Sequence, residues 1–503
     1  MAEYPDFKHG AYGEIDASGI PLTDKNATKQ AIVYIGTAPV HLVEGGAANV
    51  NVPMLINNIG EAKAYLGYSD NWADYTLCEA EKVHFEDVGV APLVFINVLD
   101  PVKHKAQTGG TATLVPDNGR VKIANAEAII LDSLVVSSGG TVKTKGVHYT
   151  VSYDFTKKMI VISEKTKGSL GTSALSITYD RIDPSSVTEA DVIGTTDNYG
   201  LNTGMYAIKN VYNVTGYVPA FIVAPGFSSI PAIHNAMYEN SLSISKHWNA
   251  WMFVDMPILD TQGNALTLAN AADWKNANGY NKDNEDVFFP LVKGTDGKHY
   301  HLSVLNTANF QALLVQNKGV PYMTGSNTPC SIIEDLYFTE NVKGRVYDDE
   351  VINRCLNANG INSAAYVSGR WAIWGAQAGS YNQDDGTSVN VFDTSRMMLF
   401  YLTNDFQHRR NIDIDKPMTA NKLKTIRAEE QERIDRLLGA GALLYGKAKL
   451  DGSKEAKSDI YSGDFRIRFE VTTTPLTKSL TATCVWTDDG YITFFDAMEE
   501  AVA

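Results

Sequence analysis

Short runs of consecutive apolar residues, several of them ending at Gly or Pro, recur in two parts of the chain. They are QAIVYIG at 30–36, LVFINV at 93–98, AFIVAPG at 220–226 and AWMFVDMP at 250–257. Continuous apolar runs of this length are typical of strands that are buried on both faces. Residues 59–68, 73–89 and 230–248 between these runs favour helices, and the stretch 73–89 carries a clear apolar stripe. This alternation predicts an α/β layer with a parallel sheet.

The pattern changes between residues 103 and 200. Short runs alternate apolar and polar residues there, and turn signals such as GG, DNG and KG recur about every ten residues. This pattern predicts an antiparallel β module. We therefore expect a middle α/β domain over 26–100 plus 201–355, with a β-rich domain inserted at 101–200.

The last part of the chain predicts a further domain over 356–475. We expect strands at 370–376 and 464–475, a helix at 428–446, and at 395–410 a helix for which a strand is a close alternative. Two more strands are expected at 481–487 and 491–495. The fold class is therefore α/β (α+β) and multidomain, with a mixed-sheet core, helices, an inserted antiparallel β domain and extended terminal arms.

The two ends of the chain lack the partners that an isolated strand needs. Residues 1–25 and 476–503 are too sparse in apolar residues, or too isolated, to enclose a core of their own. Such arms either fold back on their own domain or add to the sheet of another copy, because an unpaired edge can accept a strand.

Composition and charge exclude several classes of protein. The 503 residues carry a formal net charge of −15, which makes the chain a poor general binder of nucleic acid. The most apolar run, 91–99, is about half the length of a membrane span, so no membrane insertion is expected. Four widely spaced cysteines and the lack of a secretory signal favour a protein made in a cytoplasm.

The chain offers little catalytic chemistry. It has no glycine-rich phosphate loop and no nucleophile elbow. His299 and His301 could share one face of a strand and bind zinc, but no third ligand has a persuasive spacing, so a polar strand edge is the better interpretation. Cys330 and Cys355 have no nearby histidine. We therefore predict no enzyme activity, catalytic residue, cofactor or metal.

The order of several motifs resembles that of contractile tail sheath proteins from phages, R-type bacteriocins and related injection systems. The similar segments are HGAYGEIDASG at 9–19, AIVYIGTAP at 31–39, NNIGEAKAYLG at 57–67, VAPLVFINVLDP at 90–101, FIVAPG at 221–226, FVDMP at 253–257, NANGINSAAYVSGRWAIWGAQA at 357–378, FDTSRMMLFYLTNDF at 392–406 and LLGAGALLYG at 437–446. Each segment is short, but together they cover roughly 400 residues in the family's order. Residues 103–200 and 455–503 do not match the family pattern.

The resemblance implies a structural protein that polymerises with six-fold helical symmetry around a tail tube. Contraction would then drive the tube through the envelope of the target cell. The implied partners are other copies of the chain, the tail tube protein, and baseplate and tail terminator proteins. The implied location is the virion tail, after synthesis in the host cytoplasm.

The resemblance also implies that the terminal arms, 1–25 and 476–503, add strands to the sheet of neighbouring copies. The residues predicted for this strand exchange are Gly10, Tyr12, Gly13, Ile15 and Gly19 in the first arm and, in the C-terminal part, Phe465, Ile467, Phe469, Val471, Ile492 and Phe494.

The domain at 356–475 would then face the tube. Lys422, Lys424 and Arg427 are candidates for that contact, with a solvated helix face as the alternative. Two other functions stay open at this point. One is a hydrolase on an α/β scaffold, and the other is a virion surface adhesin that uses the inserted β domain.

Overall fold

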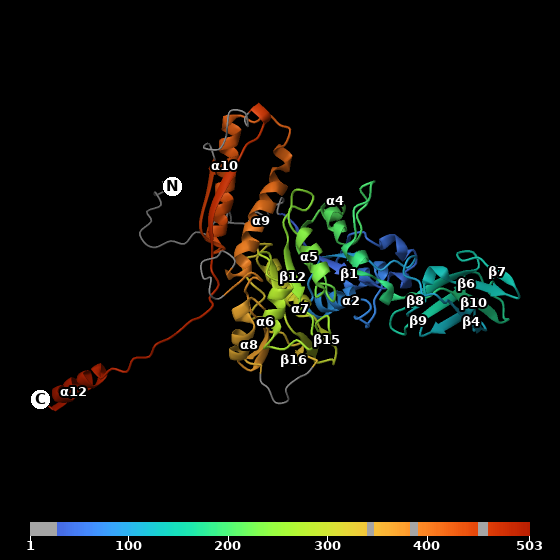
Figure 1. Cartoon of the computed structure of the whole chain (residues 1–503), viewed down its shortest axis with the longest axis horizontal. Coiled ribbons are helices and arrows are strands. Elements are labelled where there is room, and N and C mark those ends of the chain that lie inside the picture. Colours follow the sequence, from blue (N-terminus) through green and yellow to red (C-terminus); the bar gives the residue numbers. More distant parts are fainter. Residues whose placement is uncertain (1–27, 340–346, 383–390, 451–460, 503) are drawn as a thin grey trace, which may run out of the picture.

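A computed structural model describes residues 28–339, 347–382, 391–450 and 461–502. Figure 1 shows a central body, a β-rich lobe at one end, and a helical module with a long C-terminal extension at the other. No helix in these ranges is long and apolar enough to cross a bilayer.

The body is built on a six-stranded sheet with the order β13-β12-β11-β1-β3-β2. Its strands are β1 (Gln30–Gly36), β2 (Met54–Ile56), β3 (Leu93–Asn97), β11 (Val218–Val223), β12 (Trp251–Asp255) and β13 (Glu285–Phe288). All neighbours are parallel except β2, which pairs antiparallel with β3 at one edge. The four long apolar runs thus form the centre of this sheet, which confirms the predicted parallel layer.

Helices cover the sheet and join its strands. They are α1 (Ile59–Tyr65), α2 (Leu77–Glu81) with a π-helical continuation over Lys82–Val88, α3 (Glu189–Ile193), α4 (Val211–Thr215), α5 (Pro231–Glu239), α6 (Ala271–Ala277) and α7 (Leu302–Gln316). Helix α7 packs against β12 and β13, and α2 packs against β1. A small antiparallel sheet of β14 (Leu291–Gly294), β15 (His299–Tyr300) and β16 (Ile333–Tyr337) extends the body.

The β-rich lobe consists of two antiparallel sheets with a core of their own. One sheet has the order β4-β10-β6-β7 and the other β5-β9-β8. The strands are β4 (Gly110–Leu114), β5 (Arg120–Ala124), β6 (Val135–Ser138), β7 (Thr141–Lys143), β8 (Tyr149–Asp154), β9 (Met159–Glu164) and β10 (Leu175–Tyr179). Their alternating apolar side chains form a cluster separate from the main core. Figure 1 shows this lobe projecting from the end of the body opposite the helical module.

The C-terminal part adds α8 (Asp349–Cys355), the hairpin β17 (Ser363–Val367) with β18 (Arg370–Trp374), and the long helices α9 (Asp393–Arg410) and α10 (Ala420–Gly439). Strands β19 (Leu443–Leu450) and β20 (Ile467–Thr473) follow, and the described chain ends with α12 (Asp489–Val502). Figure 1 shows β19 and β20 beside α10, and α12 at the far end of an extended segment.

Several predicted element boundaries are wrong. The helix expected over 230–248 ends at Glu239, and the helix expected over 428–446 begins at Ala420 and ends at Gly439. Leu443, which was assigned to that helix, instead begins strand β19. Gly441 has a φ of 75°, the left-handed conformation that ends helices, and this separates the helix from the strand.

Candidate interface for assembly

Helices α9 and α10 and the β19–β20 ribbon form one module with a small core. The ribbon turns its inner face toward the helices, where Ala448 and Phe469 pack against apolar residues of α9 and α10. Phe406 of α9 contacts Phe469 edge to face, with ring centroids 5.6 Å apart. At Gly446 the helix comes so close that a Cβ atom would lie 2.2 Å from Ile434 Cγ2. The glycine therefore permits the close approach of strand and helix.

A network of charged side chains joins α9 to α10. Arg409 forms paired hydrogen bonds of 2.7 Å to both carboxylate oxygens of Glu430 and also contacts Asp405. Arg410 reaches Glu430 as well, and Arg433 contacts Asp405. Burial acts to raise the pKa of Glu430, but the hydrogen bonds and charges of Arg409 and Arg410 outweigh it and lower that pKa. This bidentate pairing fixes the angle between the two helices.

The ribbon is incomplete as a sheet. Strands β19 and β20 pair only with each other within the described residues, so each has an outer edge without a neighbouring strand. A two-stranded sheet is marginally stable in water unless another layer supports it. Here α9 and α10 provide that layer on one face, while no other described element covers the second face or pairs with the two outer edges. Free edges of this kind can accept a strand from another chain.

The residues predicted for strand exchange divide into three groups. Ile467, Phe469 and Val471 lie in β20, and Phe469 and Val471 pack against the module's own core. Phe465 precedes the strand and is exposed. Strand exchange at β20 would therefore use main-chain groups at its edge rather than these inward-facing side chains. Gly10, Tyr12, Gly13, Ile15 and Gly19 lie outside the described residues.

The C-terminal arm differs from the prediction. No regular element forms over 474–488, and residues 491–495, expected as a strand, lie in helix α12. The prediction of a strand that contains Ile492 and Phe494 is therefore wrong. Every side chain from 479 to 491 is exposed, among them Trp486 at 78%. An extended segment of 15 residues spans up to about 50 Å, so it can reach beyond its own module.

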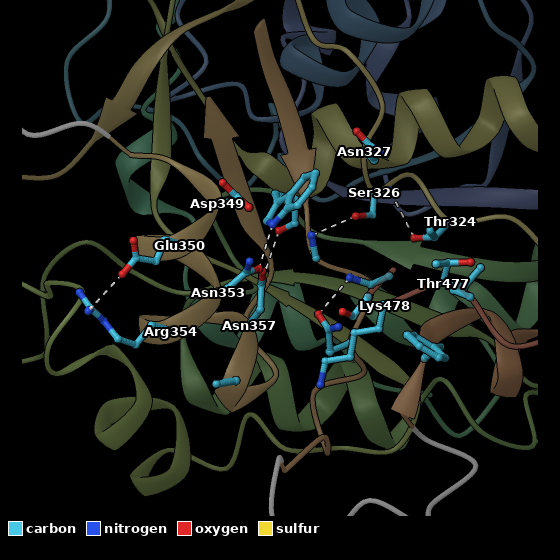
Figure 2. Close-up of a pocket in the computed structure, with 18 residues that line it drawn as sticks. Thr324, Ser326, Asn327, Asp349, Glu350, Asn353, Arg354, Asn357, Thr477 and Lys478 are labelled. Carbon is cyan, nitrogen blue, oxygen red and sulfur yellow. Dashed lines mark hydrogen bonds and ion pairs between the residues drawn. The ribbon is translucent and has the colours of Figure 1, made fainter. Parts of the chain in front are cut away.

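The arm leaves the body beside a cavity with a volume of about 870 Å³. Figure 2 shows this cavity with Lys478 and Thr477 of the arm on one side and Asp349, Glu350 and Asn353 of α8 on another. Lys478 Nζ donates a hydrogen bond of 2.8 Å to the Tyr381 hydroxyl oxygen. The root of the arm is therefore attached to the body, whereas the side chains from 479 to 491 are exposed.

The candidate tube-facing residues lie at the start of α10. The side chain of Thr419 caps this helix by accepting a hydrogen bond from the Lys422 amide. Lys422 also forms an ion pair with Asp413, at 3.1 Å. Lys424 is exposed and Arg427 is half-buried on the same helix, three residues apart, so the two share one face. Their contact with a tube stays a prediction.

The first described residue is attached to the same module. The Thr28 hydroxyl donates a hydrogen bond of 2.8 Å to Asp405 Oδ1 and lies 3.2 Å from His408 Nδ1. The chain therefore enters the body alongside α9. Both arms start close to the α9–α10 module.

Two buried carboxyl groups lie where the module meets the body. Asp393 begins α9 and accepts hydrogen bonds from the Thr324 hydroxyl and the Thr394 amide. Burial raises its pKa to about 7 despite these hydrogen bonds. Asp286 of β13 has a pKa raised well above its usual value by burial and by the charge of Asp393. These groups were not predicted from the sequence, because nothing in it shows that 286 and 393 meet.

The residues considered for metal or nucleophilic chemistry have structural partners. His299 stacks on Tyr337, with ring centroids 3.7 Å apart, and His301 Nδ1 lies 2.6 Å from Glu79 Oε2. Burial lowers the pKa of His301, but the Glu79 carboxylate raises it to about 9, so this imidazole is protonated and unsuited to bind zinc. The described residues contain no cluster that could hold a metal ion. Burial raises the pKa of Cys330 to about 11, which disfavours the reactive thiolate.

Comparison with known proteins finds a related sequence and similar solved structures. No family model matches the chain. A tail sheath protein of Burkholderia phage BcepMu is 26% identical over 461 residues, which cover 90% of this chain and 91% of that protein. A chain in the six-fold symmetrised baseplate of the anti-feeding prophage has a TM-score of 0.54 at 12% identity. A chain of the helical sheath of the same prophage in its contracted state has a TM-score of 0.51 at 12% identity. Both matches cover 97% of this chain and 100% of the other.

Proposed function

We propose that this chain, which is a homologue of phage tail sheath proteins, polymerises into the contractile sheath around a tail tube. Contraction of the sheath would drive the tube through the envelope of the target cell. The relation to a tail sheath protein over 90% of the chain carries this conclusion. The comparisons lend no support to a hydrolase or to a surface adhesin.

Strand exchange would hold the subunits together. Within the described part of the chain, the β19–β20 ribbon has two unpaired edges and the segment 474–488 has no strand partner. Main-chain hydrogen bonds at an edge do not depend on particular side chains, so such a link can persist while the rigid bodies move. Residues 1–25 are the second candidate strand, since the chain enters beside α9 at Thr28.

Contraction requires two arrangements of the subunits that differ in free energy. We expect the contracted sheath to bury more surface between subunits, and the extended sheath to be held by a kinetic barrier. No nucleotide is needed in this scheme. The partners are further copies in a six-fold helical array, the tail tube, and the baseplate and terminator proteins. The sheath would belong to the virion tail, after synthesis in the host cytoplasm.

The tube contact is proposed for Lys422, Lys424 and Arg427. It should be weak and sensitive to salt, because the sheath must release the tube when it contracts. Reversal of all three charges should weaken tube-templated assembly at low salt. Unchanged assembly of this variant would exclude these residues from the contact.

Deletion of residues 479–503 tests the assembly function directly. The purified wild-type chain should form long striated tubes in negative-stain electron micrographs. The truncated chain should stay soluble and monomeric, with an unchanged melting temperature, because the described side chains it loses from the extended segment are exposed. Tubes formed as readily by the truncated chain would contradict the role of this arm. A folded wild-type chain that never assembles would contradict the function itself.

A further inference from the structure

Helix α12 has an apolar face with no partner among the residues that the structure describes. Tyr491, Phe494, Phe495 and Met498 follow the i, i+3, i+4, i+7 spacing that places side chains on one face of a helix. Each of them is at least half exposed, with Phe494 at 59% and Phe495 at 62%. Figure 1 shows α12 at the end of the extended segment, away from the body and from the β19–β20 ribbon. Four large exposed apolar side chains on one face indicate a surface that another molecule covers.

The charge of α12 restricts its partner. Residues 488–502 contain five acidic residues and no Lys or Arg. Asp496 follows Phe495 by one position, so it lies about 100° around the helix, on the flank of the apolar face. A surface that binds α12 should therefore be apolar at its centre and basic at its margin.

The outer face of the β19–β20 ribbon has this composition. Leu444 is 62% exposed and Tyr445 is 43% exposed, and Lys447 and Lys449 follow on the exposed side of the same strand. Arg468 of β20 is paired with Lys449 across the ribbon and is also exposed. Glu470 is the acidic residue of this face, and it is already engaged by Lys449 and Arg468. The inner face of the ribbon is covered by α9 and α10, whereas no described element covers this outer face.

We propose that α12 of one subunit packs on the outer face of the β19–β20 ribbon of a second copy. The ribbon would then lie between helices on both faces, which is a stable layer arrangement for a small sheet. The proposal rests on the assembly function argued above and adds a different contact to it. Strand exchange uses the edges of the ribbon, whereas α12 would cover its face. Docking of the helix would also fix the far end of the arm to the subunit that receives it.

The large cavity at the root of the arm is a poorer partner for α12. Figure 2 shows that Asp349 and Glu350 line it together with Arg354 and Lys478, so the two acidic side chains offset the two basic ones. The ribbon instead offers Lys447, Lys449 and Arg468. Charge therefore favours the ribbon over the cavity.

A cysteine pair tests the contact in assembled tubes. Leu444→Cys and Phe494→Cys are introduced together in a Cys484→Ser background, because Cys484 is the exposed native thiol within the described residues. Oxidation should produce ladders of disulfide-linked chains on non-reducing gels, since a disulfide forms only where the two Cα atoms approach within about 7 Å. The control pairs Phe494→Cys with Tyr199→Cys, a residue 97% exposed in the loop before α4.

The outcomes separate this inference from the assembly function. Ladders from the 444/494 pair and not from the 199/494 pair support the docking of α12. Tubes that form normally but give equal cross-linking in both pairs overturn it and leave the sheath function intact. A wild-type chain that forms no tubes overturns the sheath function, and the inference falls with it.

A charge exchange tests the same contact without cysteines. Lys447→Glu with Lys449→Glu should raise the subunit concentration needed for tubes by roughly tenfold, a change of about 1.4 kcal/mol. Asp489→Lys with Asp496→Lys should do the same. All four substitutions together should restore most of the wild-type assembly. Failure of the combined variant to recover, while each variant melts at the wild-type temperature, would contradict the pairing of these two surfaces.

Discussion

The sheet of the body and the ribbon of the C-terminal module differ in how far their own chain buries them. In the body, every residue of β3, β11 and β12 is buried, and the sheet has helices packed against it. In the module, β19 alternates between buried and exposed residues, and helices cover one face. The apolar side chains of the first sheet are buried within the body. Among the described residues, the second sheet has unpaired edges and one uncovered face, and the apolar side of helix α12 is also uncovered.

This difference separates two uses of β-structure in one chain. The mostly parallel sheet of the body, whose central strands are fully buried, forms a folded core within one chain. The β19–β20 ribbon, beside the helices α9 and α10, supplies a surface whose exposed apolar groups would be buried in the proposed assembly. A protein that must move as a rigid unit while its contacts persist needs both parts.

The largest expected effect is a difference in unfolding free energy between two variants, each with one phenylalanine replaced, one from each region. Phe95→Ala in β3 should lower the free energy of unfolding by about 3–5 kcal/mol, because Phe95 is fully buried and packs on Tyr34 and Phe85. Phe494→Ala in α12 should change it by less than about 0.5 kcal/mol in the monomer. Urea unfolding of both variants measures the contrast. A Phe494→Ala monomer destabilised as strongly as Phe95→Ala would mean that α12 packs on its own chain.

The junction between the two regions should respond to pH. Asp393 has a folded-state pKa of about 7, above the usual value near 4, so the folded chain binds more protons than the unfolded chain between these values. Its contribution is therefore favourable at pH 4 and is lost as the pH rises through 7. The loss is on the order of 4 kcal/mol if the whole difference is expressed.

Asp393→Asn removes this titration. The variant should gain stability over the wild type as the pH rises from 5 to 8, as measured by melting temperature at each pH. Asp349→Asn, on the exposed start of α8, is the control and should show no such gain. An equal pH slope in wild type and Asp393→Asn would assign the titration to another group, with Asp286 the first to examine.

The elements that the sequence could predict are those whose own apolar pattern is unambiguous. The strands at 30–36 and 93–98 lie in the closed sheet, where burial on both faces requires an uninterrupted apolar run. For residues 395–410 the pattern predicts a helix, with a strand as a close alternative. The helix is buried against both the body and α10, which explains why it shows no distinct apolar face.

The errors concentrate in the open region. The run LLGAGALLYG continues the leucine spacing of α10 past its end, so strand β19 was assigned to the helix, although Gly439 and Gly441 offered a stop signal. The run YITFF satisfies strand and helix patterns alike. Its continuation to Met498 at helical spacing was the signal for α12. The contacts that these elements make in an assembly depend on other chains, so no pattern within this sequence determines them.

The smallest expected effect is the loss of stability in Gly446→Ala, which measures how tightly the ribbon packs on its helices. Gly446→Ala places a Cβ atom 2.2 Å from Ile434 Cγ2, so strand and helix must separate slightly, at a cost of about 1–3 kcal/mol. Gly439→Ala is the matched control, because nothing lies within 4 Å of its Cβ position. In the closed sheet, Gly36→Ala would place its Cβ 2.3 Å from Thr76 Oγ1 and should cost at least as much. If the melting temperature of Gly446→Ala matches that of Gly439→Ala, the ribbon can shift away from α10 at little cost in stability, unlike the strands of the body. The module would then be flexible on its covered face as well as open on the other.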